Sequence, residues 1–175
     1  FKNGMHVMFN HFGSIHSFSS NMMGIFNVYN LMAAVAAVHI TTQKPLEEIC
    51  EALEGFGGVS GRMETVSENP LIIVDFAHTP DGMKEVLQSF NEKEIICVFG
   101  AGGDRDREKR PLMGQVAAAY SKHIIVTSDN PRNEDPDMII EDILRGIANH
   151  PSVQVEINRK EAIKTACHIA KPGDI

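Results

Sequence analysis

A run of charged residues follows a glycine-rich turn in the second half of the chain. Residues 104–110 are all charged (Asp-Arg-Asp-Arg-Glu-Lys-Arg), and residues 100–103 before them include three glycines. Glycine lets the backbone turn sharply and expose N–H groups, and guanidinium groups pair with carboxylates and phosphates. The pattern is neither a Walker A loop nor a GxGxxG motif. It predicts an anion-binding corner without naming the ligand, and a solvated charged loop is the alternative.

Two further polar segments follow apolar runs. Residues 75–80 (Asp-Phe-Ala-His-Thr-Pro) come after 71–74, and residues 128–134 (Ser-Asp-Asn-Pro-Arg-Asn-Glu) come after 124–127. Each segment alone suits a turn or a helix cap, and Asp75 is a candidate cap for the next helix. Three successive segments of this kind favour a functional face.

The side chains of these segments suit an amino acid. Arg110 and Arg132 are rigid forks for carboxylate or phosphate. Asp129 and Asn130 accept hydrogen bonds, and Asp129 can pair with an ammonium group. A ligand with both carboxylate and ammonium groups matches this mixture. We see no Ser-His-Asp or Cys-His arrangement and predict no covalent nucleophile.

The elements that position these segments alternate regularly after residue 70. We expect strands at 71–74, 94–99, 123–127 and 153–157, and helices at 81–90, 111–120, 136–146 and 160–170. The alternation is typical of an α/β fold with a parallel sheet covered on both faces. Right-handed crossovers then bring all the strand carboxyl ends to one edge, where ligands bind in such sheets.

The first sixty residues have a different pattern. Residues 5–9 and 14–18 are candidate strands, and residues 45–53 a candidate helix. Residues 24–30 lead into residues 31–38, a helical and nearly all-apolar run, which predicts a buried helix. The glycine-rich segment 55–61 predicts a boundary between two domains.

Asn27 and Asn30 lie near the start of the apolar helix. They are three residues apart, so they share a helix face. Asn27 suits a helix cap, and the alternative is a pair of amides that reaches a ligand.

Composition sets limits on function. The net charge of −7 argues against a general nucleic-acid binder. Cys50, Cys97 and Cys167 lie in apolar-periodic segments, so we expect reduced core thiols of a cytosolic protein. No apolar run is judged long enough to span a membrane. The chain starts without Met and stops after a turn signal at the first residue of an expected strand, so we expect both ends to be cuts in a longer protein.

Six motifs occur in one order over nearly the whole chain: Phe26-Asn-Val-Tyr-Asn30, Gly61-Arg-Met-Glu64, Val74-Asp-Phe-Ala-His-Thr-Pro-Asp81, Phe99-Gly-Ala-Gly-Gly-Asp-Arg-Asp106, Lys109-Arg-Pro-Leu-Met-Gly114 and Asp129-Asn-Pro-Arg132. Jointly these motifs are highly specific. With them the chain resembles the Mur ligase family, most closely the members that add meso-diaminopimelate.

The resemblance implies a domain organisation. Residues 1–60 are similar to the end of a central ATP-binding domain, and residues 61–175 to most of a C-terminal, Rossmann-like domain that binds the incoming amino acid. Absent from these residues are the family's P-loop, its carbamylated lysine that holds Mg²⁺, a Gly-Lys-Gly-His-Glu-like segment and the UDP-sugar domain. We therefore expect half an ATP site and no turnover by this chain alone.

The resemblance also implies a reaction and its substrates. ATP, with Mg²⁺, phosphorylates the D-glutamate γ-carboxylate of UDP-MurNAc-L-Ala-D-Glu. The amine of meso-diaminopimelate attacks the acyl phosphate, in peptidoglycan precursor synthesis in the cytoplasm. The implied partners are these small molecules, not nucleic acid or membrane.

Site residues follow from the matching motifs. Nucleotide-binding residues by this resemblance are Asn27, Asn30, Arg62 (also catalytic, at the ATP phosphates), Asp75 and His78. Amino-acid-binding residues are Arg110, Asp129, Asn130, Pro131 and Arg132. Arg132 is expected to hold the distal carboxylate that lysine lacks. No metal ligand is assigned.

Alternatives stay open at this point. One is a lysine-adding member of the family. Another is a folylpolyglutamate synthetase, which shares Asp-x-Ala-His but not Asp-Asn-Pro-Arg. A third is a non-catalytic module that binds an amino acid or a nucleotide.

Overall fold

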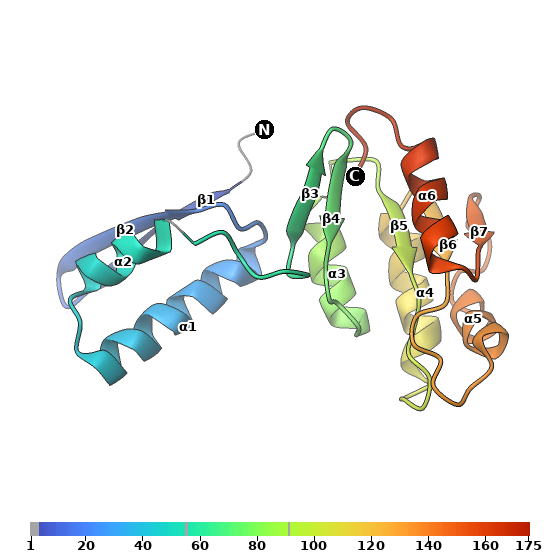
Figure 1. Ribbon diagram of the computed structural model, residues 1–175, viewed down its shortest axis with the longest axis horizontal. Coiled ribbons are helices and arrows are strands. Elements are labelled where there is room, and N and C mark those ends of the chain that lie inside the picture. Colours follow the sequence, from blue (N-terminus) through green and yellow to red (C-terminus); the bar gives the residue numbers. More distant parts are fainter. Residues whose placement is uncertain (1–3, 55, 91) are drawn as a thin grey trace. The chain divides into compact units, whose positions relative to one another are not determined.

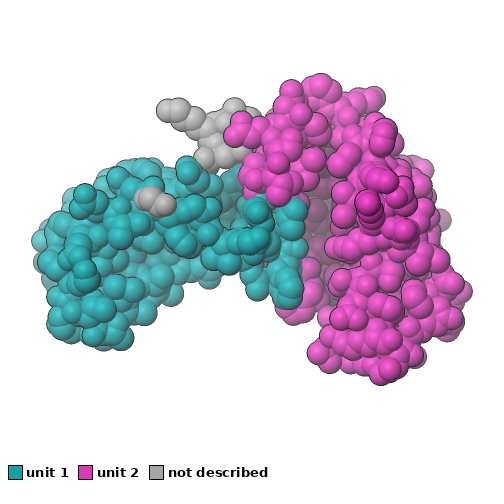
Figure 2. All heavy atoms as spheres, in the orientation of Figure 1, with its two compact units in different colours: residues 1–64, 74–76 teal, residues 65–73, 77–175 magenta. Residues whose placement is uncertain are grey.

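The computed structural model describes residues 4–54, 56–90 and 92–175, and its elements are labelled in Figure 1. The chain divides into two compact units, which Figure 2 colours separately. The first comprises residues 1–64 and 74–76, and the second residues 65–73 and 77–175. Gly55, part of the expected domain boundary, lies outside the described residues.

The first unit is a hairpin packed with two helices. Strands β1 (Met5–His11) and β2 (Ser14–Ser20) pair antiparallel, which confirms the two predicted strands. Helices α1 (Ile25–Thr42) and α2 (Leu46–Glu54) follow, as predicted. Because alternate residues of the hairpin point to one face, that face and the two helices share an apolar core. Its buried members are Val7, Phe18, Met22, Leu31, Val35, Leu46, Ile49 and Cys50.

The prediction that α1 is buried is wrong. Its buried residues are Asn27, Leu31 and Val35, which are four apart and form one stripe, while Tyr29 and Ile40 are exposed. By length and composition alone α1 could also cross a bilayer, which corrects the expectation that no apolar run is long enough. Because Leu31 and Val35 pack into the hairpin core, the helix has the contacts of a globular core helix.

A two-stranded sheet of β3 (Glu64–Glu68) and β4 (Leu71–Val74) follows. Strand β4 has the predicted bounds, but β3 was not predicted. The expectation that residues 71–74 belong to the parallel sheet is wrong, because β4 pairs with β3 in a sheet of its own.

The second unit contains a parallel sheet in the order β5 (Ile96–Phe99), β6 (His123–Val126), β7 (Val153–Val155). The helices are α3 (Pro80–Gln88), α4 (Lys109–Tyr120), α5 (Pro136–Leu144) and α6 (Arg159–Ile169). Side chains of α3, α4 and α5 share one core with β5 and β6. Helix α6 packs against β5 and β6, and Figure 1 labels these elements. This arrangement confirms the predicted α/β fold.

The last residues lie beside β5. The Ile175 N–H donates to the Glu94 carbonyl at 3.0 Å, and the Ile96 N–H donates to the Ile175 carbonyl at 2.7 Å. The Leu71 N–H of β4 donates to the Asp174 carbonyl at 3.3 Å. Residues 174–175 therefore bond to both β4 and β5, as the expected strand residue at Ile175 would.

The cysteines differ in exposure. Cys50 and Cys97 are buried, but Cys167 is exposed on α6, so the prediction of three core thiols is wrong for Cys167. All three are free. Burial raises the pKa of the Cys97 thiol to about 12, so this thiol is protonated at neutral pH.

Candidate functional site

Two of the predicted polar segments are neighbours at the carboxyl edge of the parallel sheet. Phe99 at the end of β5 pairs with Val126 at the end of β6. The chain leaves these strands as two loops, which we call the glycine loop (residues 100–108) and the arginine loop (residues 128–134). The Thr127 N–H, between β6 and the arginine loop, donates to the Phe99 carbonyl at 2.9 Å. Strand register therefore sets the two loops side by side.

The two loops are bonded along their length. The Gly103 N–H donates to the Asn130 carbonyl at 2.8 Å, and the Asn133 amide donates to the Asp104 carboxylate at 2.8 Å. The guanidinium of Arg132 donates to the Gly103 carbonyl. A Cβ at position 103 would lie 1.9 Å from the Pro131 carbonyl oxygen. Only glycine permits this approach.

The glycine loop differs from the expected anion-binding corner. Helix α4 begins at Lys109, several residues after the glycines, and Pro111 lies in its first turn as expected. The backbone N–H groups of Gly103 and Asp104 donate to Asn130 and Glu134 of the arginine loop. Because these donors bond to protein, the glycines serve mainly the contact between the loops.

The predicted amino-acid residues of the arginine loop lie at the surface. Asp129, Asn130 and Arg132 are exposed and Pro131 is half-buried. Arg132 has a left-handed backbone (φ 51°), which is unusual for a residue with a side chain. Apart from its bond to Gly103, its guanidinium has no hydrogen-bond partner among the described residues. Arg132 can therefore bind a further anion without losing an ion pair.

Arg110 lies beneath the loops, not at the surface. Its side chain has no exposed area. Its Nη2 donates to Glu134 Oε1 at 2.7 Å and its Nη1 to Asp142 Oδ2 at 2.9 Å. The bonds to Glu134, more than those to Asp142, raise the pKa of Arg110. The structure thus places Arg110 with the other predicted residues, but as an enclosed side chain held by two carboxylates.

Glu134 and Asp142 were not predicted, although the sequence contains a signal for the burial of Arg110. Arg110, Met113, Gly114 and Ala117 are the buried residues of α4, and their spacing forms one helix stripe. A charged residue on such a stripe needs an oppositely charged partner, because burial of an unpaired charge is costly. Hydrogen bonds from Arg110 are the main reason that the pKa of Glu134 falls to about 2.

A second group of predicted residues lies in the first unit. The Met63 N–H donates to Asp75 Oδ2 at 2.8 Å, and the Arg62 guanidinium lies 4.6 Å from the centre of the Phe76 ring. This distance is typical of a cation–π contact. Arg62 is exposed. Asp75 therefore holds the segment that carries Arg62, and it is not a helix cap: Thr79 caps α3 by accepting the Gly82 N–H at 3.1 Å.

Glu64 closes the turn around Arg62. Its carboxylate accepts the Gly61 N–H at 2.7 Å and the Ser60 hydroxyl at 2.9 Å. The Gly61 bond, more than the Ser60 bond, lowers the pKa of Glu64. The turn thus has a fixed backbone on both sides of Arg62.

His78 lies in the loop between β4 and α3 and is exposed. Its backbone carbonyl accepts a hydrogen bond from Lys109 Nζ at 2.9 Å. Lys109 is the first residue of α4. The loop that carries His78 is therefore tied to the helix that carries Arg110.

Asn27 and Asn30 share a face of α1, as predicted. The Asn27 side chain is buried and donates to the Met23 carbonyl at 2.7 Å. Its Oδ1 accepts the Asn30 amide at 3.1 Å, and Asn30 is exposed. Gly24 is the N-cap of α1, so the interpretation of Asn27 as the cap is wrong.

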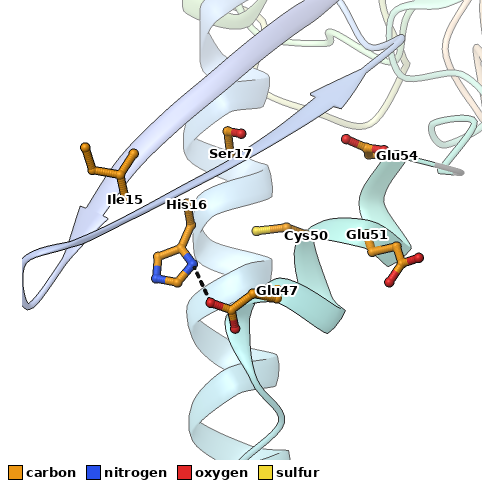
Figure 3. Close-up of a pocket in the computed structure, with 7 residues that line it drawn as sticks. All are labelled: Ile15, His16, Ser17, Glu47, Cys50, Glu51 and Glu54. Atoms are coloured by element: carbon orange, nitrogen blue, oxygen red, sulfur yellow. Dashed lines mark ion pairs between the residues drawn. The ribbon is translucent and has the colours of Figure 1, made fainter.

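A pocket of about 300 Å³ lies between β2 and α2 (Figure 3). Its lining comprises Ile15, His16, Ser17, Glu47, Cys50, Glu51 and Glu54, none of them a predicted site residue. His16 Nδ1 lies 3.3 Å from Glu47 Oε1. Burial, and then the charges of Glu47 and Glu54, raise the pKa of Cys50, which disfavours a thiolate nucleophile here.

These features define an α/β domain that carries two bonded, polar loops at the carboxyl edge of its parallel sheet. A family model described as "Mur ligase, glutamate ligase domain" matches residues 61–175, and the chain belongs to the Mur ligase family.

Several curated proteins that share one name are similar in sequence to most of the chain. The UDP-N-acetylmuramoyl-L-alanyl-D-glutamate–2,6-diaminopimelate ligase of Wolinella succinogenes is 56% identical over 86% of the chain and 35% of its own length. The ligases of the same name from Helicobacter pylori (strain J99) and Aquifex aeolicus are 51% and 48% identical over 89% and 93% of the chain. The chain spans about a third of the length of these relatives.

Solved structures agree with the fold. A structure of a ligase with the same name has a TM-score of 0.63 at 39% identity, covering 93% of the chain and 34% of that structure. The folylpolyglutamate synthase of Mycobacterium tuberculosis complexed with ADP has a TM-score of 0.73 at 20% identity, covering 89% of the chain and 36% of that structure. The second likeness concerns the fold alone.

Proposed function

We propose that the whole protein containing this chain is an ATP-dependent ligase that adds meso-diaminopimelate to UDP-MurNAc-L-Ala-D-Glu. ATP transfers its γ-phosphoryl group to the D-glutamate γ-carboxylate, giving an acyl phosphate and ADP. The amine of meso-diaminopimelate attacks the acyl carbon, and the tetrahedral intermediate collapses with release of inorganic phosphate. This chemistry requires positioning and charge neutralisation more than a protein nucleophile.

The arginine loop supplies the amino-acid site in this proposal. Arg132 binds the distal carboxylate of meso-diaminopimelate. Asp129 and Asn130 accept hydrogen bonds from the ammonium group that does not react. Pro131 shapes the turn and faces Gly103 through its carbonyl. The observation that carries the proposal is the exposed Arg132 fork, held on one side only by Gly103. A charge-assisted hydrogen bond from this fork would contribute roughly 1.5–3 kcal/mol, about ten- to a hundredfold in discrimination against lysine.

Arg110 has a different part in the same site. Its guanidinium is fully enclosed between Glu134 and Asp142, so contact with a ligand would require one of these carboxylates to release it. We assign Arg110 the role of holding the arginine loop in place from below. Removal of one partner from a buried ion pair is costly, because the other charge is left unpaired.

The nucleotide contacts in this proposal are assigned residue by residue, most of them to the first unit. Arg62 is exposed, and its guanidinium over Phe76 suits it to meet the phosphates of ATP. Asp75 and His78 are assigned to the ribose side. Asn30 presents an exposed amide that Asn27 orients. When bound, ATP supplies the phosphoryl group that activates the carboxylate.

No magnesium ligand is assigned among these residues. Within residues 4–54, 56–90 and 92–175, no group of three or more His, Cys, Asp or Glu side chains gathers where a metal ion could be held. The proposal therefore assigns Mg²⁺ no ligand in this part of the protein and routes no step through it.

The substrates are soluble nucleotides and an amino acid, so we place the reaction in the cytoplasm.

The test is phosphate release by the whole protein with ATP, UDP-MurNAc-L-Ala-D-Glu and one amino acid. Release with meso-diaminopimelate and not with L-lysine is the expected result. Release with L-lysine alone would keep the ligase but replace the amino acid. Release with neither would overturn the proposal and leave a folate-linked ligase or a non-catalytic binding module.

A further inference from the structure

Glu134 is the most heavily bonded side chain between the two loops. Its Oε1 accepts the Asp104 N–H at 2.6 Å and Arg110 Nη2 at 2.7 Å. Its Oε2 accepts Arg107 Nη2 at 2.7 Å and Arg110 Nη1 at 3.0 Å. A carboxylate has about four acceptor positions, so these bonds engage it fully. Glu134 joins the glycine loop, the start of α4 and the arginine loop at one point.

Arg110, which bonds both carboxylate oxygens of Glu134, is itself held in place by its surroundings. Arg110 has no exposed area and is also bonded to Asp142 of α5 at 2.9 Å. Helix α5 approaches α4 closely, since a Cβ at Gly146, just after α5, would lie 1.8 Å from the Pro111 carbonyl oxygen. Only 11% of the Glu134 side chain is exposed. The carboxylate is therefore fixed from below by a guanidinium that is itself fully buried.

Two residues next to Glu134, one in each loop, have a left-handed backbone. Arg132, two residues before it, has φ 51°, and Asp104, whose N–H it accepts, has φ 50°. A left-handed conformation costs a residue with a side chain free energy and persists where the surroundings enforce it. The Glu134 N–H also donates to the Pro131 carbonyl at 3.0 Å, which closes the turn that contains Arg132. The bonds of Glu134 hold both conformations.

We propose that Glu134 is a positioning residue for the incoming amino acid: it fixes the arginine loop in the conformation that presents Arg132 and Asp129. This inference rests on the proposed function. Glu134 touches neither substrate nor ATP in this account. It acts through the Asp104 N–H, Arg107 and Arg110, so its loss should weaken recognition of the amino acid and leave recognition of the other substrates intact.

The experiment compares Glu134→Gln with Asp142→Asn in the whole protein. Glu134→Gln keeps the size but turns an amide N–H toward groups that already donate, so the link between the loops breaks. Asp142→Asn is the matched control, because Asp142 bonds Arg110 and Arg145 but neither loop. Both changes remove one carboxylate from the same buried guanidinium, so both should lower stability.

The KM for each substrate separates positioning from stability. We expect Glu134→Gln to raise the KM for meso-diaminopimelate at least tenfold and to change the KM for ATP and for the UDP-linked dipeptide less than twofold. Asp142→Asn should change all of them less than threefold. Glu134→Asp, which keeps the charge, should recover part of the loss. Equal effects of Glu134→Gln and Asp142→Asn, or a rise in every KM, would overturn the inference.

A second variant covers the case in which Glu134→Gln does not fold. Arg107 is 67% exposed, and its ion pair in the structure is with Glu134. Arg107→Ala should leave folding intact and raise the KM for meso-diaminopimelate two- to fivefold, and an unchanged KM would contradict the inference. An unmodified protein that releases no phosphate with any amino acid would instead reject the proposed function, and the inference with it.

Discussion

The carbonyl oxygen of Pro131 lies 1.9 Å from the position that a Cβ on Gly103 would occupy. The glycine loop and the arginine loop therefore fit together only while residue 103 has no side chain. Their contact brings Arg132 to the Gly103 carbonyl and Asn133 to the Asp104 carboxylate. The geometry of the candidate amino-acid site thus depends on a residue that makes no side-chain contact of its own.

Gly103→Ala should move the two loops apart. We expect a loss of about 1–3 kcal/mol in the free energy of unfolding, because a methyl group cannot be placed without shifting backbone. Urea denaturation measures it. Gly57→Ala is the control: a Cβ there meets nothing within 4 Å, so its effect should stay within about 0.5 kcal/mol. Equal midpoints for the two variants would show that the close contact is absent in solution.

The stability lost in Glu134→Gln should depend on pH. The pKa of Glu134 is lowered from 4.5 to about 2, chiefly by hydrogen bonds from Arg110. A folded-state pKa below the ordinary value means that the ionised carboxylate stabilises the fold fully above pH 4.5, and that this stabilisation fades as pH falls toward 2. The gap in unfolding free energy between the unmodified chain and Glu134→Gln should therefore shrink over that range.

Urea titrations at several pH values between 6 and 3 measure this gap. Glu141→Gln on α5 is the control, because Glu141 is exposed and forms no ion pair within the described residues. Its unfolding free energy should follow that of the unmodified chain at each pH. A gap for Glu134→Gln that stays constant down to pH 3 would mean that the carboxylate is not held by the guanidinium groups.

The three thiols should react at very different rates. Cys167 is exposed, while Cys50 and Cys97 are buried with raised pKa values. Because the thiolate is the reactive form, iodoacetamide at pH 8 should label the folded chain once, at Cys167. Mass spectrometry counts the labels, and Cys167→Ser should abolish labelling. Labelling of Cys97 at a similar rate would show that the core of the second unit opens readily.

The sequence was sufficient to predict the parallel arrangement of β5 and β6 and the meeting of the loops that follow them. Apolar runs such as 96–99 and 123–126 indicate buried strands, and right-handed crossovers place their carboxyl ends together. The starts of the helices near Pro80 and Pro136 were also predictable, because proline in the first turn of a helix is a local signal.

Features that depend on distant partners were not predicted. Arg110 is enclosed because Glu134 and Asp142, 24 and 32 residues away, converge on it, and a run of seven charged residues does not reveal which one turns inward. Strand β3 has the mixed sequence Glu-Thr-Val-Ser-Glu, which contains no apolar run to indicate a strand. Its pairing with β4 in the structure is what identifies it as one. Helix α1 is apolar all round, so its composition could not distinguish its one buried stripe from its exposed faces.

The purified chain should release no phosphate from ATP with UDP-MurNAc-L-Ala-D-Glu and meso-diaminopimelate. Arg62, Asp75 and His78 are proposed contacts of the nucleotide, but the sequence contains no GxxxxGK[ST] loop to hold its phosphates. A coupled phosphate assay with the whole protein as the positive control makes the measurement. Turnover by the chain alone at a rate near that of the whole protein would contradict this division of the ATP site.

The most direct test of the amino-acid site is the ratio of kcat/KM for meso-diaminopimelate to that for L-lysine, measured with the whole protein before and after Arg132→Ala. We expect the ratio to fall about ten- to a hundredfold, because the bond to the distal carboxylate is lost and lysine has no such group. Arg145→Ala, which removes an exposed arginine outside both loops, should leave the ratio unchanged. A ratio that is the same with and without the Arg132 guanidinium would contradict the assignment of the arginine loop as the diaminopimelate site.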